Sequence, residues 1–260
     1  MTTAVRVLTF GLQNQLRNRW ILGYGLLFAL LTDALFRFGG SGPRVVVSLL
    51  NVVLLVIPLV SVVFGTLHLS NSREFIELLL AQPVSRAALY VGLYFGLALP
   101  LAGAFTAGVA VPVLLHGGAG AAGLGTLLFV GSVLTLVFTS LAFVAGVHFD
   151  DRARGLGLAL LVWFAATVLY DGMVLLIATL FADWPLETPM LVLSLLNPVD
   201  LGRVLLLLSV DVAALMGYTG AVFERFFGGG LGVALAGLAL LAWTVLPFLL
   251  GLRGFARKDF

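Results

Sequence analysis

The chain has 260 residues, of which 61% are hydrophobic and only 10% are charged. Because a soluble domain carries about 25% charged residues, this composition excludes a soluble globular protein and predicts an integral membrane protein. The net charge of +2 argues against nucleic acid as a partner, and the lack of cysteine excludes disulfides and thiolate metal sites built from this chain.

The apolar runs are continuous rather than alternating, which favours transmembrane helices over a barrel and predicts an all-α fold. Before the first run, residues 1–19 place Val5, Leu8, Leu12 and Leu16 on one helical stripe, as in an amphipathic helix lying on the membrane surface. A single transmembrane domain over residues 1–260 has room for about six spans of roughly 20 residues. The predicted spans are Trp20–Phe38, Val45–Leu67, Ala87–Leu115, Ala121–Val147, Gly155–Leu180 and Leu231–Leu252.

Residues 181–230, before the last span, are less regular. Asn197–Asp200 predicts a helix start, with a capping Asn, a Pro at the first helical position and an acid in the first turn. The apolar run that follows, Leu201–Val210, is too short to cross a membrane. We therefore expect a re-entrant or extracytoplasmic helical segment here.

The placement of Lys and Arg predicts the orientation, because cytoplasmic loops are enriched in these residues. With six spans and the N-terminus inside, ten of the fourteen Lys and Arg residues face the cytoplasm, and the other four face outward. The inner ones are Arg6, Arg17, Arg19, Arg73, Arg86, Arg152, Arg154, Arg253, Arg257 and Lys258, and the outer ones are Arg37, Arg44, Arg203 and Arg225. We expect an inner-membrane protein with both termini in the cytoplasm.

A charged segment, residues 70–86, interrupts the apolar chain between the second and third predicted spans. Asn71, three residues before Glu74, resembles a capping arrangement, and Pro83 ends the predicted helix. Apolar residues share one face of this helix and charged residues lie near the other. It is therefore either a docking element for a partner or an ordinary helical loop.

This segment, Ser72–Arg86, resembles the signature of type-2 ABC exporter permeases, in which an acidic, leucine-rich helix ending in Pro, a small residue and Arg follows the second span. The surface helix and the irregular region before the last span are also similar, so the resemblance covers nearly the whole chain. It implies a homodimeric or pseudo-dimeric pore whose coupling helix presses into a groove on a cytoplasmic ABC ATPase, which binds ATP and Mg. The contact residues that it implies are Arg73, Glu74, Phe75, Glu77, Leu78, Gln82 and Arg86.

The chain carries no nucleotide-binding loop of its own. Such a loop needs Gly-x-x-x-x-Gly-Lys-Ser/Thr, and the single lysine, Lys258, is followed by Asp259. We therefore expect a non-catalytic subunit without a cofactor of its own.

A narrower resemblance is to the permeases of the nitrous-oxide-reductase maturation system, and it rests on Leu196–Asp200 and Met216–Phe223. It implies a periplasmic accessory protein as a further partner and a role in assembling the copper–sulfur centre of that enzyme. The candidate contacts for the accessory protein are Asp200, Arg203, Asp211 and Tyr218.

Several other polar residues have two interpretations each. Asp33 lies four residues before Arg37, which predicts a local ion pair, whereas Asp171 lies deep in the fifth predicted span and needs a partner or a watery cavity. Asp171 could make a polar contact across a dimer or line a pore. A charged cluster in the next loop is either a second ATPase contact or a solvated loop; its residues are Asp150, Asp151, Arg152 and Arg154.

Three other functions compete with an ABC permease. The first is an ion-coupled secondary transporter that uses Asp171 as the coupling carboxylate. The second is a membrane enzyme, for which reactive residue types are sparse and scattered. The third keeps the ABC architecture without translocation, so that the outer segment acts mechanically on a periplasmic partner.

Overall fold

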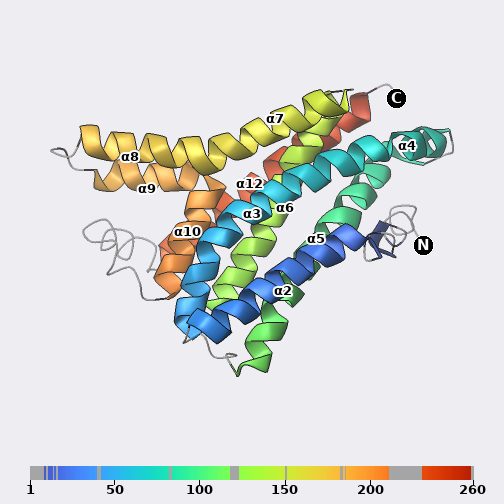
Figure 1. Ribbon diagram of the computed structural model, residues 1–260. Helices are drawn as coiled ribbons and strands as arrows, with labels where there is room; N and C mark the ends of the chain where they lie inside the picture. The colour runs from blue at the N-terminus through green and yellow to red at the C-terminus, as the bar shows by residue number, and fades with distance from the viewer. Residues whose placement is uncertain are drawn as a thin grey trace.

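The computed structural model describes residues 9, 11–13, 15, 17–39, 42–81, 84–117, 123–149, 151–181, 184, 186–210 and 230–258. All regular elements within these ranges are helical, which confirms the predicted all-α fold (Figure 1). Of the predicted surface helix over residues 1–19, residues 9, 11–13 and 15 are described and helical, whereas residues 17 and 18 are described and not helical.

Six helices in the described part of the chain are long and apolar enough to cross a membrane, which confirms the predicted number of spans. Most of the predicted boundaries hold within a few residues; the second span, for example, continues to Asn71 rather than Leu67. Spans 1 to 4 and 6 are α2 (Arg19–Gly39), α3 (Gly42–Asn71), α5 (Arg86–Leu115), α6 (Leu124–His148) and α12 (Gly230–Arg257). Span 5 is built from α7 (Arg152–Phe164), the π-helical segment η1 (Ala165–Leu169) and α8 (Tyr170–Leu180).

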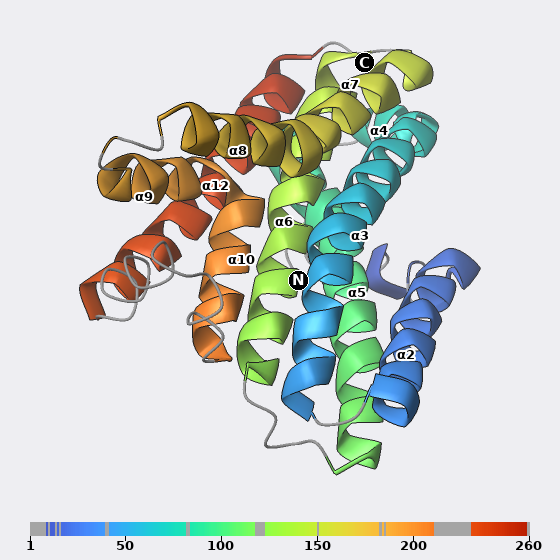
Figure 2. The same cartoon turned by 60° about the vertical axis from the view of Figure 1, so that its left-hand side comes forward.

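Three shorter helices lie outside these spans. Helix α4 (Arg73–Leu80) follows α3, while α9 (Glu187–Leu196) and α10 (Pro198–Ser209) meet at a bend of 114°. We call α9 and α10 the hairpin. The prediction of a short helix after Asn197 is confirmed, but α9 was not predicted. In Figures 1 and 2, α9 runs alongside α8.

Hydrogen bonds fix which helix ends lie together. At the end that carries α4, which we call the α4 end, Arg86 at the start of α5 donates to the carbonyl of Ala256 in α12, and the Lys258 ammonium donates to the carbonyl of Val147 in α6. At the opposite end, His116 after α5 lies 3.5 Å from Asp33 in α2. Successive spans therefore run in opposite directions between these two ends, as in a membrane bundle.

The main hydrophobic core lies between α2, α3, α5 and α6, and we call these helices the central bundle. Its largest fully buried side chains include Phe28, Ile57, Phe105 and Phe138, one from each helix. Close contact between small residues supports this packing, as is usual for helices in lipid. The burial is uneven among the spans: in the 18-residue window that identifies each span, 61% of α6 is buried but only 6% of span 5.

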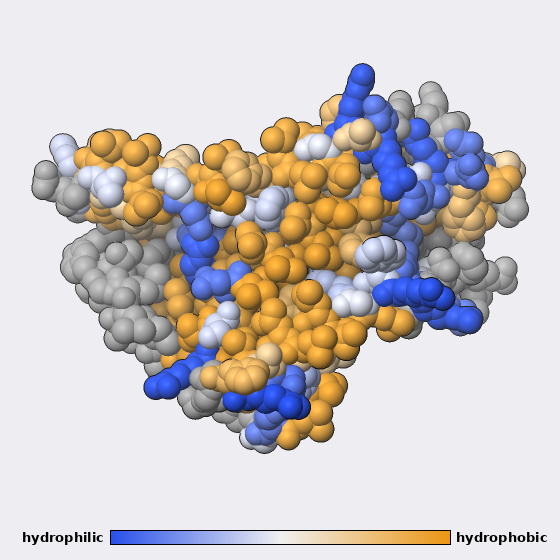
Figure 3. Space-filling view, in the orientation of Figure 1, coloured by the Kyte–Doolittle hydropathy of each residue, from blue (hydrophilic) through white to orange (hydrophobic). Residues whose placement is uncertain are grey.

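A second, smaller hydrophobic cluster joins α8, the hairpin and α12. Its buried members are Met190, Leu201, Val204, Ala236 and Leu240. On the face that Figure 3 shows, the surface is mostly apolar between hydrophilic patches at the α4 end and at the opposite end. A further hydrophilic patch interrupts the apolar surface between α8 and α10.

Candidate functional site: helix α4 and the polar elbow

Helix α4 begins without the side-chain cap that the sequence predicts. Helix α3 continues through Asn71, so this residue cannot cap α4, and the Ser72 hydroxyl donates to the carbonyl of His68 at 2.7 Å. The capping prediction was therefore wrong. The helix depends instead on packing, because Ile76 is fully buried and Leu79 and Leu80 pack against the main core.

The other face of α4 is open to the surroundings. Glu74 and Glu77 are exposed, and Leu78 beside them on this face is 70% exposed. We call these three residues the exposed α4 face. One side of α4 is thus packed against the core, while the other side carries two carboxylates and an exposed leucine.

The remaining predicted coupling residues differ in position. Arg73 and Phe75 are half-buried, and Gln82 lies outside the described residues. Arg86 is the first residue of α5, and its guanidinium donates to the carbonyls of Ala256 and Lys258. Arg86 thus ties the last turn of α12 to the segment that follows α4.

The predicted second contact lies at the start of α7, also at the α4 end. The Asp151 carboxylate accepts from the Ala153 amide at 2.8 Å and so caps α7, and it lies 3.6 Å from the guanidinium of Arg154. Arg152 is exposed, and Asp150 lies outside the described residues. This cluster is a capped, solvated helix start with two exposed arginines.

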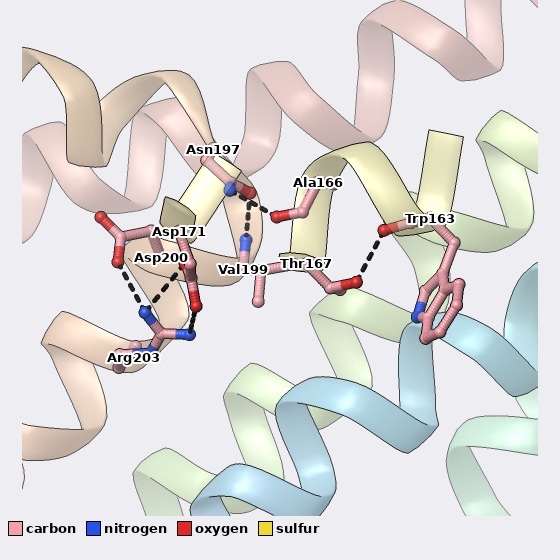
Figure 4. A network of polar contacts seen from close by, with 8 residues as sticks. All are labelled: Trp163, Ala166, Thr167, Asp171, Asn197, Val199, Asp200 and Arg203. Atoms are coloured by element: carbon pink, nitrogen blue, oxygen red, sulfur yellow. Dashed lines mark hydrogen bonds and ion pairs between the residues drawn. The ribbon is translucent and has the colours of Figure 1, made fainter. Parts of the chain in front are cut away.

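A network of polar contacts lies where the hairpin bends (Figure 4). Asn197 plays two parts there: its side-chain oxygen accepts from the Val199 amide at 3.0 Å, and its Nδ2 donates to the Ala166 carbonyl in η1 at 2.7 Å. The predicted cap is confirmed. The bond to η1 brings the bend against the middle of span 5.

Charged residues complete this group. The Arg203 guanidinium donates to both carboxylate oxygens of Asp171, at 2.6 and 3.1 Å, and to Asp200 at 3.3 Å. A bidentate pair of this kind is stronger and more directional than a single hydrogen bond. Asp171 thus has its partner within the chain, and two predicted partner-contact residues, Asp200 and Arg203, bind each other.

Backbone carbonyls near the end of α9 also accept hydrogen bonds from side chains of neighbouring spans. The Tyr170 hydroxyl donates to the Leu193 carbonyl, and Trp243 Nε1 of α12 donates to the Leu195 carbonyl at 3.3 Å. Such bonds give partners to carbonyls in the last turn of α9, which have no acceptor role within the helix because it ends at Leu196. We call the whole group the polar elbow, which comprises Ala166, Tyr170, Asp171, Leu193, Leu195, Asn197, Val199, Asp200, Arg203 and Trp243.

Two further predictions concern polar residues away from the elbow. Asp33 pairs with Arg37 at 2.7 Å, which confirms the local ion pair. Asp211 and Tyr218 lie outside the described residues. Among the residues that the structure does describe, no three His, Cys, Asp or Glu side chains are grouped so that they could hold a metal ion.

The six spans, the short helix after span 2 and the broken hairpin before the last span define the chain as a multi-pass α-helical membrane protein. The profile of the ABC-2 family transporter proteins matches residues 7–260. The chain therefore belongs to the ABC-2 transporter family and is an ABC permease, and this family implies an ATPase partner.

Two relatives make the comparison more specific. The chain is similar to the probable ABC transporter permease protein NosY of Stutzerimonas stutzeri, with 28% identity over 95% of both chains. It is 33% identical to the protein of the same name from Pseudomonas aeruginosa, over 78% of this chain and 81% of the relative. The predicted resemblance to ABC exporter permeases is confirmed.

Proposed function

We propose that this chain is the membrane subunit of an ABC transporter in which the exposed α4 face contacts a separate cytoplasmic ATPase. That partner holds ATP and Mg, and this chain converts the motion of the ATPase into movement of its spans. The observation that carries the proposal is the two-sided packing of α4. Ile76 anchors the helix to the core while Glu74, Glu77 and Leu78 face outward.

The arrangement of charge supports an α4 end that faces the cytoplasm of an inner membrane. Arginines of the α4 end include Arg19, Arg152 and Arg257, whereas Arg37 and Arg44 lie at the opposite end. Positive charge concentrates on the cytoplasmic side of membrane proteins. Both termini then lie in the cytoplasm, and the hairpin opens toward the outer side.

A second copy of the chain completes the transporter. Span 5 supports this arrangement, because it is the least buried of the six spans within one chain. Its exposed apolar residues include Leu161, Leu169, Leu175 and Leu176. A partner copy would cover part of this surface, and membrane lipid would cover the rest.

The relatives support a role in maturation of nitrous oxide reductase, with a periplasmic accessory protein as a further partner. Both are named as probable NosY permeases, and one of them aligns with 95% of this chain. In this function the chain transports a component across the membrane or acts mechanically on the accessory protein. The outer hairpin and the residues after it, including Asp211 and Tyr218, are the proposed contact region.

A secondary transporter is less well supported. In that function Asp171 would exchange a coupling ion with solution during each cycle. Instead, the Asp171 carboxylate is bound by the Arg203 guanidinium through both of its oxygens. This pairing favours a structural role for Asp171.

Co-purification with the ATPase tests the proposed contact. We expect the wild-type chain to bring down an ATP-binding subunit from its own cells, and the double variant E74K/E77K to lose most of it, because the variant reverses both charges of the exposed α4 face. Arg44→Glu is the matched control, since it reverses an exposed charge at the opposite end. Equal recovery of the ATPase by E74K/E77K and wild type would refute the contact site.

A further inference from the structure

Span 5 changes its packing partners at η1. Leu160 and Trp163 of α7 pack against the main core, whereas Val174 and Ile177 of α8 pack against the second cluster. Trp163 Nε1 also donates to the carbonyl of Leu55 in α3 at 3.2 Å. The half of the span before η1 therefore belongs with the central bundle, and the half after it belongs with the hairpin.

The π-helical geometry of η1 makes it a bending point. A π turn interrupts the i to i+4 hydrogen-bond ladder, and such turns are common causes of helix kinks and are frequent at functional sites. Within this region the Thr167 hydroxyl donates to the Trp163 carbonyl at 2.8 Å. The Ala166 carbonyl, in contrast, receives its bond from Asn197 of the hairpin. The conformation of η1 thus depends on a residue outside the span.

Arg203 binds α8, the helix that follows this bending point. It projects from α10, which lies so close to α6 that a Cβ added to Gly202 would be 2.7 Å from a methyl carbon of Val130. Helix α10 is therefore fixed to the central bundle, and its Arg203 binds Asp171 just beyond η1. The side chains of Arg203 and Asp171 are 29% and 37% exposed, so the pair lies at the surface of the chain and not within its hydrophobic core.

We propose that η1 is a hinge and that the Arg203–Asp171 pair is the clasp that sets its position. While the clasp is closed, α8 is held to α10 and through it to the central bundle. When it opens, α8 swings about η1 relative to α7. Arg203 and Asn197 are then positioning residues, which set where α8 lies. The nucleotide-driven use of this hinge rests on the proposed ATPase coupling, but the hinge itself does not.

Distances between two spin labels on the full-length chain in lipid nanodiscs test the hinge. The chain has no native cysteine, so labels can be attached to introduced ones at exposed positions. The pair Leu176→Cys on α8 and Phe129→Cys on α6 reports the hinge, and the pair Leu161→Cys on α7 and Leu55→Cys on α3 is the reference. Dilution with unlabelled chain restricts the measurement to distances within one copy.

Without nucleotide, the wild-type chain should give one narrow α8–α6 distance. Arg203→Gln should add a second, longer α8–α6 distance and leave the α7–α3 distance unchanged. The charge swap D171R/R203D should restore the single distance, a rescue that a general loss of packing would not show. Arg154→Gln is the matched control, because it removes an exposed ion pair on the same span before the hinge, and it should change neither distance.

A second variant keeps the test decisive if Arg203→Gln fails to fold. Asn197→Asp retains the acceptor for the Val199 amide but removes the donor to Ala166, and it should broaden the α8–α6 distance alone. An unchanged α8–α6 distance in the folded variants, or an equal shift in both label pairs, would overturn the hinge. If these variants behave as expected but ATP with Mg moves neither pair in the complete complex, the hinge stands and the ATPase coupling fails.

Discussion

The central bundle and the region around the polar elbow hold their helices together by different means. Between α2 and α5 the backbones are so close that a Cβ added to Gly108 would lie 2.5 Å from the carbonyl oxygen of Gly25. Around the elbow, side chains such as Asn197 and Arg203 bridge between helices instead. Close backbone packing is lost when small residues are enlarged, whereas each polar bridge depends on a single pair of side chains or on one side chain and one carbonyl. We infer that the bundle is the fixed part of the transporter and the elbow the part that can be repositioned.

The largest difference between these two regions should come from filling the contact between α2 and α5. Gly108→Ala places a methyl group against backbone, which cannot move aside, so we expect a loss of about 3 kcal/mol in the free energy of unfolding. Gly103→Ala on the same helix is the control, because nothing lies within 4 Å of its added Cβ. Denaturant titration in micelles measures both. Equal stability of the two variants would mean that α2 and α5 are not packed this closely.

A smaller effect is expected at the elbow. Asn197→Asp leaves the partly buried Ala166 carbonyl without its donor and should cost about 2 kcal/mol, within the range for an acceptor that loses its partner. Asn197→Ser keeps an oxygen that can cap α10 and also removes the amide donor, but it adds no charge. Comparing the two variants therefore separates the loss of the donor from the effect of the added carboxylate. If both variants unfold at the wild-type denaturant concentration, the bond from the hairpin to η1 contributes nothing to stability.

A substitution at the contact between α10 and α6 should reduce the free energy of unfolding less than one at the contact between α2 and α5. In Gly202→Ala the added methyl group meets a methyl carbon of Val130 and not backbone, so a small shift of that side chain relieves the contact and we expect a loss of about 1 kcal/mol. Gly237→Ala in α12, with open space around its Cβ, should be neutral. A cost for Gly202→Ala that matches Gly108→Ala would remove the distinction between the two regions.

The exposed α4 face should contribute least to stability. Leu78→Ala is expected to change the free energy of unfolding by less than about 0.5 kcal/mol, as is usual for an exposed site. Ile76→Ala, two residues earlier and fully buried, is the matched comparison and should cost about 2–4 kcal/mol. Thermal denaturation of the chain without its ATPase checks this pair. A large loss for Leu78→Ala would show that the residue packs within the chain.

The spans and the start of α10 could be predicted because their signals are local. A run of about 20 apolar residues identifies a span, and the order Asn197, Pro198, Asp200 identifies a helix start, with no knowledge of the rest of the chain. The α4 segment could be predicted for the same reason. Its cap was mispredicted because α3 extends beyond its apolar run to Asn71.

The elbow could not be predicted in this way because it joins residues far apart in the sequence. Asp171 and Arg203 are 32 positions apart, and Ala166 and Asn197 are 31 apart. One signal was available: two opposite charges, each within an apolar stretch, need partners, and each could have been the partner of the other. The sequence carries no comparable signal for the bond from Asn197 to η1 or for the π-helical geometry of η1. Both depend on how the hairpin packs against span 5.

Cross-linking of a single cysteine on the exposed α4 face tests the central claim most directly. Leu78→Cys in this cysteine-free chain should form a cross-link to the ATP-binding subunit of the assembled complex. Phe38→Cys, 90% exposed at the opposite end, should form none. A Leu78→Cys chain that forms no cross-link to the ATPase, or that reacts with an impermeant thiol reagent from outside intact cells, would contradict the account.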